Sequence, residues 1–182
     1  MANISEVRPV LRHLSFFTYR SSDGKYKKIS YEKTQYTYRF LIVAKGSLSV
    51  TLDEKAEKVV ASDIIYLPPG STYRLLPSAG DFTLYSIFFD FEKEERSGSS
   101  PCGCVFLSEY DENLCSKKIE AEESCALEKS GIFSGTDAAR IFELIRRADS
   151  RNPAYAFYAS SQIQTILSEI LLLSKEPKTK SQ

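Results

Sequence analysis

The chain has 182 residues, of which 42% are hydrophobic and 26% charged, and its 24 Lys and Arg residues balance its 24 Asp and Glu residues. Balanced charge argues against a domain that binds nucleic acid by itself, because a basic excess supplies most of that affinity. The sequence has neither a membrane-spanning apolar run nor a signal-peptide pattern, so we expect one cytoplasmic domain without membrane contact.

The first half of the chain has the pattern of short antiparallel strands. Strands are predicted over residues 14–19, 36–44, 47–52, 58–61, 64–67, 72–76 and 82–91. Turn sequences such as Asp23-Gly24 and Lys45-Gly46 separate them. Closely spaced short strands of this kind are typical of a sandwich or barrel. Residues 7–11 are either an arm that precedes the barrel or a first edge strand.

Residues 92–103 are charged and then rich in small residues, which predicts an exposed loop. The four cysteines, Cys102, Cys104, Cys115 and Cys125, lie in or just after this segment. The Cys-x-Cys spacing and the absence of a nearby histidine in the sequence favour reduced thiols over a zinc site. Residues 104–107 are a candidate closing strand.

Two helices are predicted over residues 137–148 and 153–174, with Thr136 and Asn152 as their caps. Apolar residues on two adjacent faces of the second helix require two packing partners. One face can contact the barrel or the first helix. The other is either buried in the same monomer or used for self-association, as in a short coiled coil.

Residues 62–77 resemble the second cupin motif, with Ser62, Pro68, Gly70 and Tyr73 at its spacing. Counting back from Gly46, the first motif falls on residues 33–46. The four metal-ligand positions of the cupin motifs are then occupied by Lys33, Gln35, Arg39 and Tyr73. None of these is a good ligand for a divalent metal at neutral pH, so we expect no metal and no cofactor.

The run from 38 to 91 and the helix pair are similar to the N-terminal sensor domain and linker helices of AraC-type transcription regulators. This resemblance implies a mostly β protein: a metal-free cupin or jelly-roll barrel with an N-terminal arm over residues 1–133, then helices over 134–175 and a linker tail over 176–182. The family's helix-turn-helix domain would lie outside this chain, and DNA would be contacted only through it. The resemblance also implies a homodimer through the last helix, at Ile163, Ile166, Ile170 and Leu173.

Candidate ligand-binding residues follow from strand alternation and from this resemblance. Alternate residues of a barrel strand face the interior, which selects Lys33, Gln35 and Arg39 on one strand and Tyr73 and Leu75 on another. Two further positions match the sugar-pocket lining of the family's arabinose sensor, and they are Ser86 and Phe88.

The cationic and hydroxyl groups of this set favour a hydroxylated or anionic effector, such as a sugar. The alternative is that Arg39 bonds a carboxylate or backbone carbonyls and binds no ligand. We therefore expect an effector-binding domain and not an enzyme. The other candidates are a ligand carrier and a metal-independent enzyme of epimerase or isomerase type, for which His13, outside the predicted barrel strands, is the one histidine available as a base.

Overall fold

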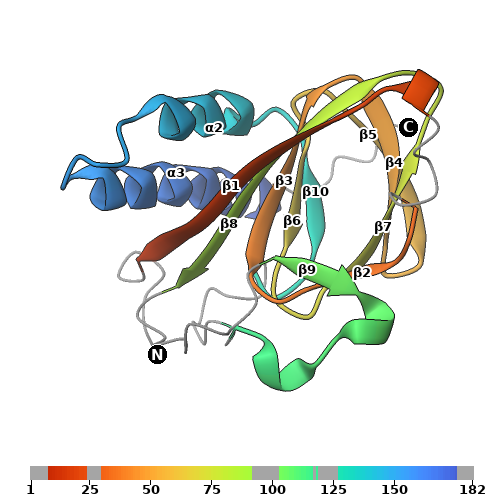
Figure 1. The fold of residues 1–182 in the computed structure, drawn as a ribbon, viewed down its shortest axis with the longest axis horizontal. Coiled ribbons are helices and arrows are strands. Elements are labelled where there is room, and N and C mark those ends of the chain that lie inside the picture. Colours follow the sequence, from red (N-terminus) through yellow and green to blue (C-terminus); the bar gives the residue numbers. More distant parts are fainter. Residues whose placement is uncertain (1–7, 24–29, 92–102, 117, 119–126, 176–182) are drawn as a thin grey trace.

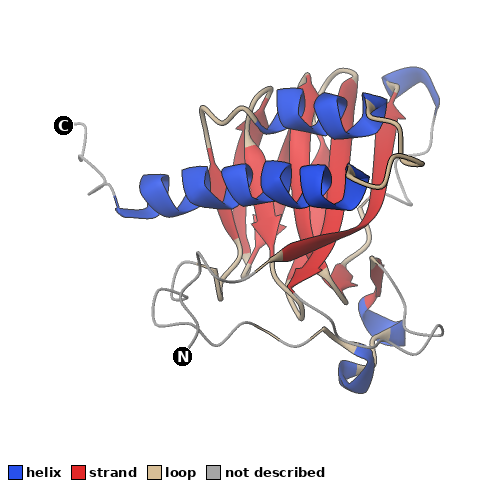
Figure 2. Cartoon of the chain, turned by 90° about the vertical axis from the view of Figure 1, so that its left-hand side faces the viewer, coloured by secondary structure: helices blue, strands red, loops and turns tan. Residues whose placement is uncertain are grey.

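The computed structural model describes residues 8–23, 30–91, 103–116, 118 and 127–175. Its strands form two five-stranded sheets with antiparallel pairing, and two helices cover the outer face of one sheet (Figures 1 and 2). The first sheet contains, in spatial order, β1 (Pro9–Tyr19), β8 (Phe82–Phe91), β3 (Tyr38–Lys45), β6 (Ile64–Leu67) and β10 (Gly131–Phe133). The second contains β5 (Lys55–Val60), β4 (Ser47–Leu52), β7 (Thr72–Pro77), β2 (Lys33–Gln35) and β9 (Cys104–Phe106).

The first sheet is buried on both faces, which explains its long apolar strands. Along β3, Leu41 and Val43 face the second sheet, whereas Phe40 and Ile42 face the helices. Successive side chains of a strand point to opposite faces, so one strand supplies both hydrophobic clusters. The inner cluster fills the space between the sheets, and the outer cluster joins the first sheet to the helices.

The helices α2 (Ala138–Arg147) and α3 (Tyr155–Lys175) lie across the outer face of the first sheet (Figure 2). The rings of Tyr85 on β8 and Phe142 on α2 stack with centroids 4.2 Å apart. In the outer cluster lie the three residues Ile163, Ile166 and Ile170, each with an exposed fraction of 0%. The assignment of these isoleucines to a dimer interface is therefore wrong, because their side chains pack against the first sheet of the same chain. Leu173 stays 36% exposed.

The turn chemistry of the cupin-like motif is formed as its sequence predicts. The Asp63 carboxylate accepts a hydrogen bond of 2.8 Å from the backbone N–H of Val60, which holds the turn before β6. Gly70 has a φ of +80° in the turn between β6 and β7. That backbone region is open to glycine without steric cost, so the Pro-Pro-Gly sequence can join the two sheets.

The predicted fold class, a mostly β jelly-roll domain followed by a helix pair, is confirmed, with differences in detail. In the described part of the chain neither sheet closes on itself to form a barrel. The predicted strand 36–44 is observed as β3, which begins at Tyr38. Residues 33–35, outside that prediction, form β2 in the other sheet, because the chain bends at residues 36–37. Placing Lys33 and Gln35 on the same strand as Arg39 is therefore wrong. The first strand begins at Pro9, so residues 9–11 are an edge strand and not a separate arm.

Three smaller predictions have different outcomes. The cap at Asn152 forms, since its Oδ1 accepts a 2.9 Å hydrogen bond from the N–H of Ala154. The cap at Thr136 is wrong, because Asp137 occupies the cap position and no side chain caps α2. Cys102, Cys125 and the tail 176–182 lie outside the described residues. No helix in the described ranges combines the length and apolar character of a membrane span.

Candidate functional site

A polar cluster centred on Arg39 lies between the two sheets. Arg39 Nη1 donates a hydrogen bond of 2.6 Å to the Tyr73 hydroxyl, which comes from the opposite sheet. Arg39 Nη2 and Nε donate to Ser86 Oγ at 2.7 and 3.3 Å. The Cys104 sulfur, on β9, lies 3.8 Å from Nη1. Four strands from both sheets therefore converge on one guanidinium group.

Strand register brings these side chains together. Arg39 is opposite Phe88 in the pairing of β3 with β8, and Lys33 is opposite Tyr73 in the pairing of β2 with β7. Partners directly opposite one another share a face of the sheet. The Phe88 ring centroid lies 4.7 Å from Arg39 Cζ, and that of Tyr73 lies 5.8 Å away. The face of the Phe88 ring thus stabilises the cation, whereas Tyr73 contacts it through its hydroxyl.

Tyr73 contributes an uncharged phenol to this cluster. Burial raises the pKa of its phenol well above the usual value, and the positive charge of Arg39 opposes this shift only in part. The phenol therefore keeps its proton at neutral pH and donates it to Cys104 Sγ at 3.3 Å, while its oxygen accepts from Arg39. The result is a chain of hydrogen bonds from the guanidinium through the phenol to the thiol.

Lys33 and Gln35 extend the cluster along β2. Burial lowers the pKa of Lys33, and the positive charge of Arg39 lowers it further, while Cys104 acts in the opposite direction. Gln35 has an exposed fraction of 0%, and neither its amide oxygen nor its amide nitrogen has a hydrogen-bond partner among the described residues. Since buried polar groups are nearly always paired, this amide is a candidate for a ligand contact.

The cluster does not match the alternative in which Arg39 bonds a carboxylate or backbone carbonyls. Its partners are two hydroxyl groups and a thiol. Within the described ranges, neither Lys33 nor Arg39 forms an ion pair with a carboxylate; the cations that do are Arg12, Arg140, Arg146, Arg147 and Arg151. Lys33 and Arg39 are half-buried, and partial desolvation of a cation without a countercharge is unfavourable, so the arrangement suits a site that receives an anionic or strongly polar ligand.

A divalent metal does not fit this cluster. The four positions that correspond to cupin metal ligands carry an amine, an amide, a guanidinium group and a phenol whose pKa is raised. None of these supplies the imidazole, thiolate or carboxylate donors that such ions require. In the described part of the chain, no three His, Cys, Asp or Glu side chains cluster closely enough to hold a metal ion.

The structure brings together five of the seven predicted ligand residues as direct neighbours, namely Lys33, Arg39, Tyr73, Ser86 and Phe88. Leu75 lies in the apolar cluster between the sheets, and Gln35 is buried on β2. Sequence reasoning missed Cys104, although the candidate strand 104–107 would have suggested it: Cys104 is opposite Gln35 in the pairing of β9 with β2. Ligand binding by the set stays a prediction.

His13 is a second residue that the sequence placed wrongly. It lies on β1, not outside the strands, and is opposite Phe88 in the pairing with β8. Its ring centroid is 6.0 Å from that of Phe88, whose other contact is Arg39. The side chain is exposed, because β1 is the edge strand of its sheet. The Phe88 ring therefore lies between the His13 imidazole and the Arg39 guanidinium.

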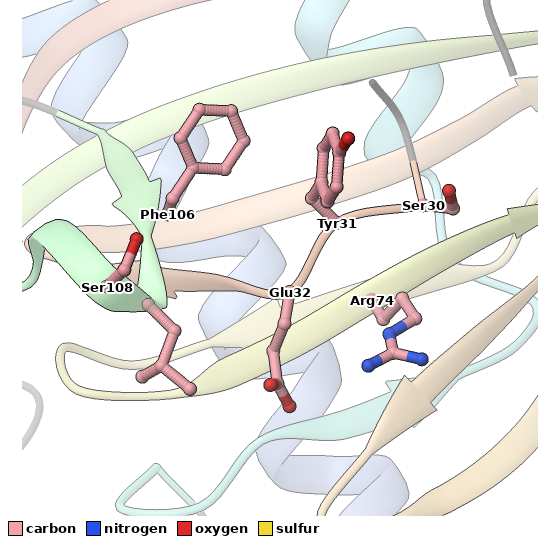
Figure 3. Close-up of a pocket in the computed structure, with 7 residues that line it drawn as sticks. Ser30, Tyr31, Glu32, Arg74, Phe106 and Ser108 are labelled. Atoms are coloured by element: carbon pink, nitrogen blue, oxygen red, sulfur yellow. The ribbon is translucent and has the colours of Figure 1, made fainter. Parts of the chain in front are cut away.

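A groove of about 810 Å³ lies beside β7 and β9 and is lined by residues of both strands and of the segment before β2 (Figure 3). Figure 3 shows the side chains of Tyr31, Phe106, Glu32 and Arg74 around it. The rings of Tyr31 and Phe106 meet edge to face at 5.6 Å and form its apolar side. Arg74 follows Tyr73 on β7 and therefore points away from the Arg39 cluster. Arg74 and the Arg39 cluster are therefore on opposite faces of β7.

Comparison with known proteins gives a likeness of fold only. No protein-family model matches the sequence, and no curated protein matches it. Among solved structures, a cupin 2 conserved barrel domain protein from Salinispora arenicola is 18% identical, with 46% of this chain matching 76% of that one at a TM-score of 0.34. A cupin superfamily protein from Desulfitobacterium hafniense is 18% identical, with coverages of 50% and 83% and a TM-score of 0.36.

A salicylate 1,2-dioxygenase from Pseudaminobacter salicylatoxidans is also similar, at 15% identity and a TM-score of 0.37. The match spans 46% of this chain and 25% of the dioxygenase. The proteins of similar structure thus include an enzyme as well as cupins of unstated activity. The prediction that the chain is not an enzyme is therefore wrong: proteins of this fold include an enzyme. The likeness carries neither a site nor an activity to this chain.

Proposed function

We propose that the chain is the effector-binding and dimerisation domain of an AraC-type transcription regulator. A small sugar-like or anionic molecule binds at the Arg39 cluster and controls DNA binding by a helix-turn-helix domain outside this chain. The observation that carries the proposal is the half-buried guanidinium of Arg39, which has no carboxylate partner, beside a buried Gln35 amide without a partner in the described structure.

The route from ligand to helices runs through β3 and β8. Arg39 and Ser86 point between the sheets, and their chain neighbours Phe40 and Ile87 pack beneath the helices. A ligand that draws Arg39 away from Ser86 moves backbone that also carries the outer cluster. Only a difference in ligand affinity between two arrangements can shift their populations, so the ligand must favour one packing of α2 and α3 over another.

The homodimer of this proposal uses the exposed end of α3. Leu172 and Leu173 are 69% and 36% exposed, and Phe157 near the start of the helix is 64% exposed. A contact between two copies of the chain at the adjacent residues Leu172 and Leu173 would remove this apolar surface from water. Sedimentation equilibrium of the chain and of a Leu172→Glu variant tests this contact. A monomer in both samples would contradict it.

Ligand binding is tested by a thermal-shift screen of the 182-residue chain against sugars, sugar acids and small organic acids. A molecule that binds only the folded state raises the melting temperature in proportion to the logarithm of its concentration. The expected result is a set of ligands whose effect is lost in Arg39→Ala, with the unliganded fold retained. Undiminished binding by Arg39→Ala would remove Arg39 from the site and contradict the proposal.

A metal-independent enzyme is the second candidate, and the position of His13 favours it. Acid–base catalysis of epimerisation needs a group that titrates near neutral pH, and an imidazole meets this need. His13 lies beside Phe88 at the edge of the cluster. The test is deuterium exchange from solvent into a ligand found in the screen, measured by NMR. Exchange that disappears in His13→Asn supports the enzyme, and binding without exchange supports the sensor.

A further inference from the structure

The charges around the Arg39 cluster are unbalanced. Lys33 is opposite Tyr73 in the pairing of β2 with β7, and Tyr73 bonds Arg39, so the two cations share a neighbour. Burial, and then the charge of Arg39, lower the pKa of Lys33. Neither cation has a carboxylate partner in the described part of the chain, whereas Arg12 on β1 pairs with Asp90 at 2.8 Å. Two cations therefore share a partly buried site with neutral hydroxyl, thiol and amide groups. A ligand that carries negative charge would relieve both the repulsion and the desolvation.

The hydrogen bonds of Arg39 indicate the shape of that negative group. Nε and Nη2 form one edge of the guanidinium and donate to the same atom, Ser86 Oγ, at 3.3 and 2.7 Å. One hydroxyl oxygen thus serves two parallel N–H groups. A carboxylate offers two oxygens at the spacing of this edge and binds it in a bidentate manner. Ser86 then becomes free to donate its own hydroxyl proton to the ligand.

Gln35 indicates a second requirement. Its amide has one acceptor oxygen and one donor nitrogen, both buried and both without partners among the described residues. A carboxylate oxygen can accept from the nitrogen, but it cannot donate to the oxygen. A ligand hydroxyl group can do both. Gln35 and Lys33 alternate to the same face of β2, and Lys33 shares that face with its partner Tyr73, which bonds Arg39.

We infer that the ligand of the Arg39 cluster is a small hydroxylated carboxylate, such as a hydroxy acid or a sugar acid, and not a neutral sugar. This inference rests on the proposed function, since it assumes that the cluster binds a small molecule. The carboxylate binds the Nε–Nη2 edge of Arg39 with Lys33 as the second cation. A hydroxyl group of the ligand pairs with Gln35, and its carbon skeleton packs on the Phe88 ring.

The test uses matched pairs of probes in which a carboxylate takes the place of a neutral hydroxymethyl group on the same skeleton: D-galacturonate with D-galactose, and 3-hydroxybutyrate with 1,3-butanediol. A further pair, 3-hydroxybutyrate with butyrate, differs in the hydroxyl group alone. Calorimetric titration of the whole chain gives each dissociation constant. We expect an acid to bind more tightly than its neutral counterpart by at least about tenfold, the effect of one charge-assisted bidentate contact. Arg39→Gln should abolish this difference.

The control is Arg74→Gln, which removes a cation from the other face of β7 and should leave acid binding unchanged. Gln35→Leu should reduce the preference for 3-hydroxybutyrate over butyrate and leave the preference for charge. Neutral members that bind as tightly as the acids would overturn this inference while supporting the proposed function. Acid binding that survives Arg39→Gln would overturn both. If no acid binds but neutral compounds in the thermal-shift screen do, this inference is overturned and the proposed function is not.

Discussion

Arg39 and Tyr73 join the two sheets through a hydrogen bond of 2.6 Å across the interior. Arg39 lies on β3 of the first sheet, and Tyr73 lies on β7 of the second. In the cupin motifs that these segments resemble, both positions correspond to metal ligands. A cation and a phenol thus make the contact between the sheets that a shared metal would make. This contact needs only protein groups, and its strength depends on the charge of Arg39.

Removing the Tyr73 hydroxyl with Tyr73→Phe should destabilise the fold by about 1.5–3 kcal/mol, the range for hydrogen bonds to charged groups. The loss arises because Arg39 Nη1 is left without its oxygen acceptor in a buried site. Urea denaturation at neutral pH measures it. Tyr31→Phe is the matched control, since Tyr31 is exposed, and it should change stability little. Equal stability of the two variants would mean that the inter-sheet bond contributes nothing net.

Lys33 should make stability depend on pH in the alkaline range. Because its pKa in the fold is lowered from about 10.5, the unfolded chain binds more protons at this group than the folded chain does. The cost of holding Lys33 protonated is therefore fully present at neutral pH, and it disappears as the pH rises from the lowered pKa to 10.5. Lys33→Met should gain stability at neutral pH and lose that gain near pH 10.5.

Denaturation of Lys33→Met and wild type at about pH 7 and about pH 10.5 measures this difference. The matched control is Lys58→Met on the edge strand β5, where the side chain is exposed and its removal relieves no burial. Because each variant is compared with wild type at the same pH, the contribution of phenol ionisation to the free energy of unfolding is the same in both and cancels from the difference. A gain that stays constant across the range would show that the charge of Lys33 costs nothing in the fold.

The sequence predicted the strands well where turn residues and alternation agree. β4, β6 and β8 have the predicted bounds, because their ends are marked by residues such as Gly46 and Pro68. It did not predict β2 or the bend at residues 36–37, and it therefore placed Lys33, Gln35 and Arg39 on one strand. The sheet to which each of these residues belongs is decided by long-range pairing, which a local pattern does not contain.

The candidate site was partly predictable for the same reason. Alternation selects Arg39 and Tyr73 for the interior, and the packing of the two sheets face to face then brings them into contact. The contribution of Cys104 depends on the pairing of β9 with β2, which no local pattern specifies. On α3 the sequence pattern led to a wrong assignment. The spacing of Ile163 and Ile166 fits a coiled coil and a sheet-covering helix equally well, and the structure shows the second. Only the position of the helix on the sheet separates the two.

Two substitutions on α3 should separate core packing from association. Ile166 is fully buried against the first sheet, and Leu172 is largely exposed. Ile166→Ala should reduce the free energy of unfolding by about 2–5 kcal/mol, as expected for a cavity in a well-packed core. Leu172→Ala should leave it nearly unchanged at protein concentrations where the chain is a monomer. Urea denaturation of each variant at two protein concentrations about tenfold apart measures both effects. A concentration-dependent loss in Ile166→Ala would return this residue to a dimer interface.

Gly46 and Gly135 provide a matched pair that separates backbone strain from steric clash. Both have positive φ, +78° for Gly46 and +75° for Gly135. A Cβ on Gly135 would meet nothing within 4 Å, whereas one on Gly46 would lie 2.2 Å from the carbonyl oxygen of Asp81 and 2.9 Å from the Cα of Phe82. Both contacts are with backbone, so a side-chain rotation cannot relieve them.

Gly135→Ala should therefore cost about 1–2 kcal/mol, the penalty of an L-residue in the left-handed region. Gly46→Ala should cost clearly more, because the turn between β3 and β4 must also move away from the start of β8. Urea denaturation of the two variants against wild type gives both values. Since the two positions share nearly the same φ, the difference between them isolates the clash. A cost no greater at Gly46 than at Gly135 would mean that the turn relaxes without resistance from β8.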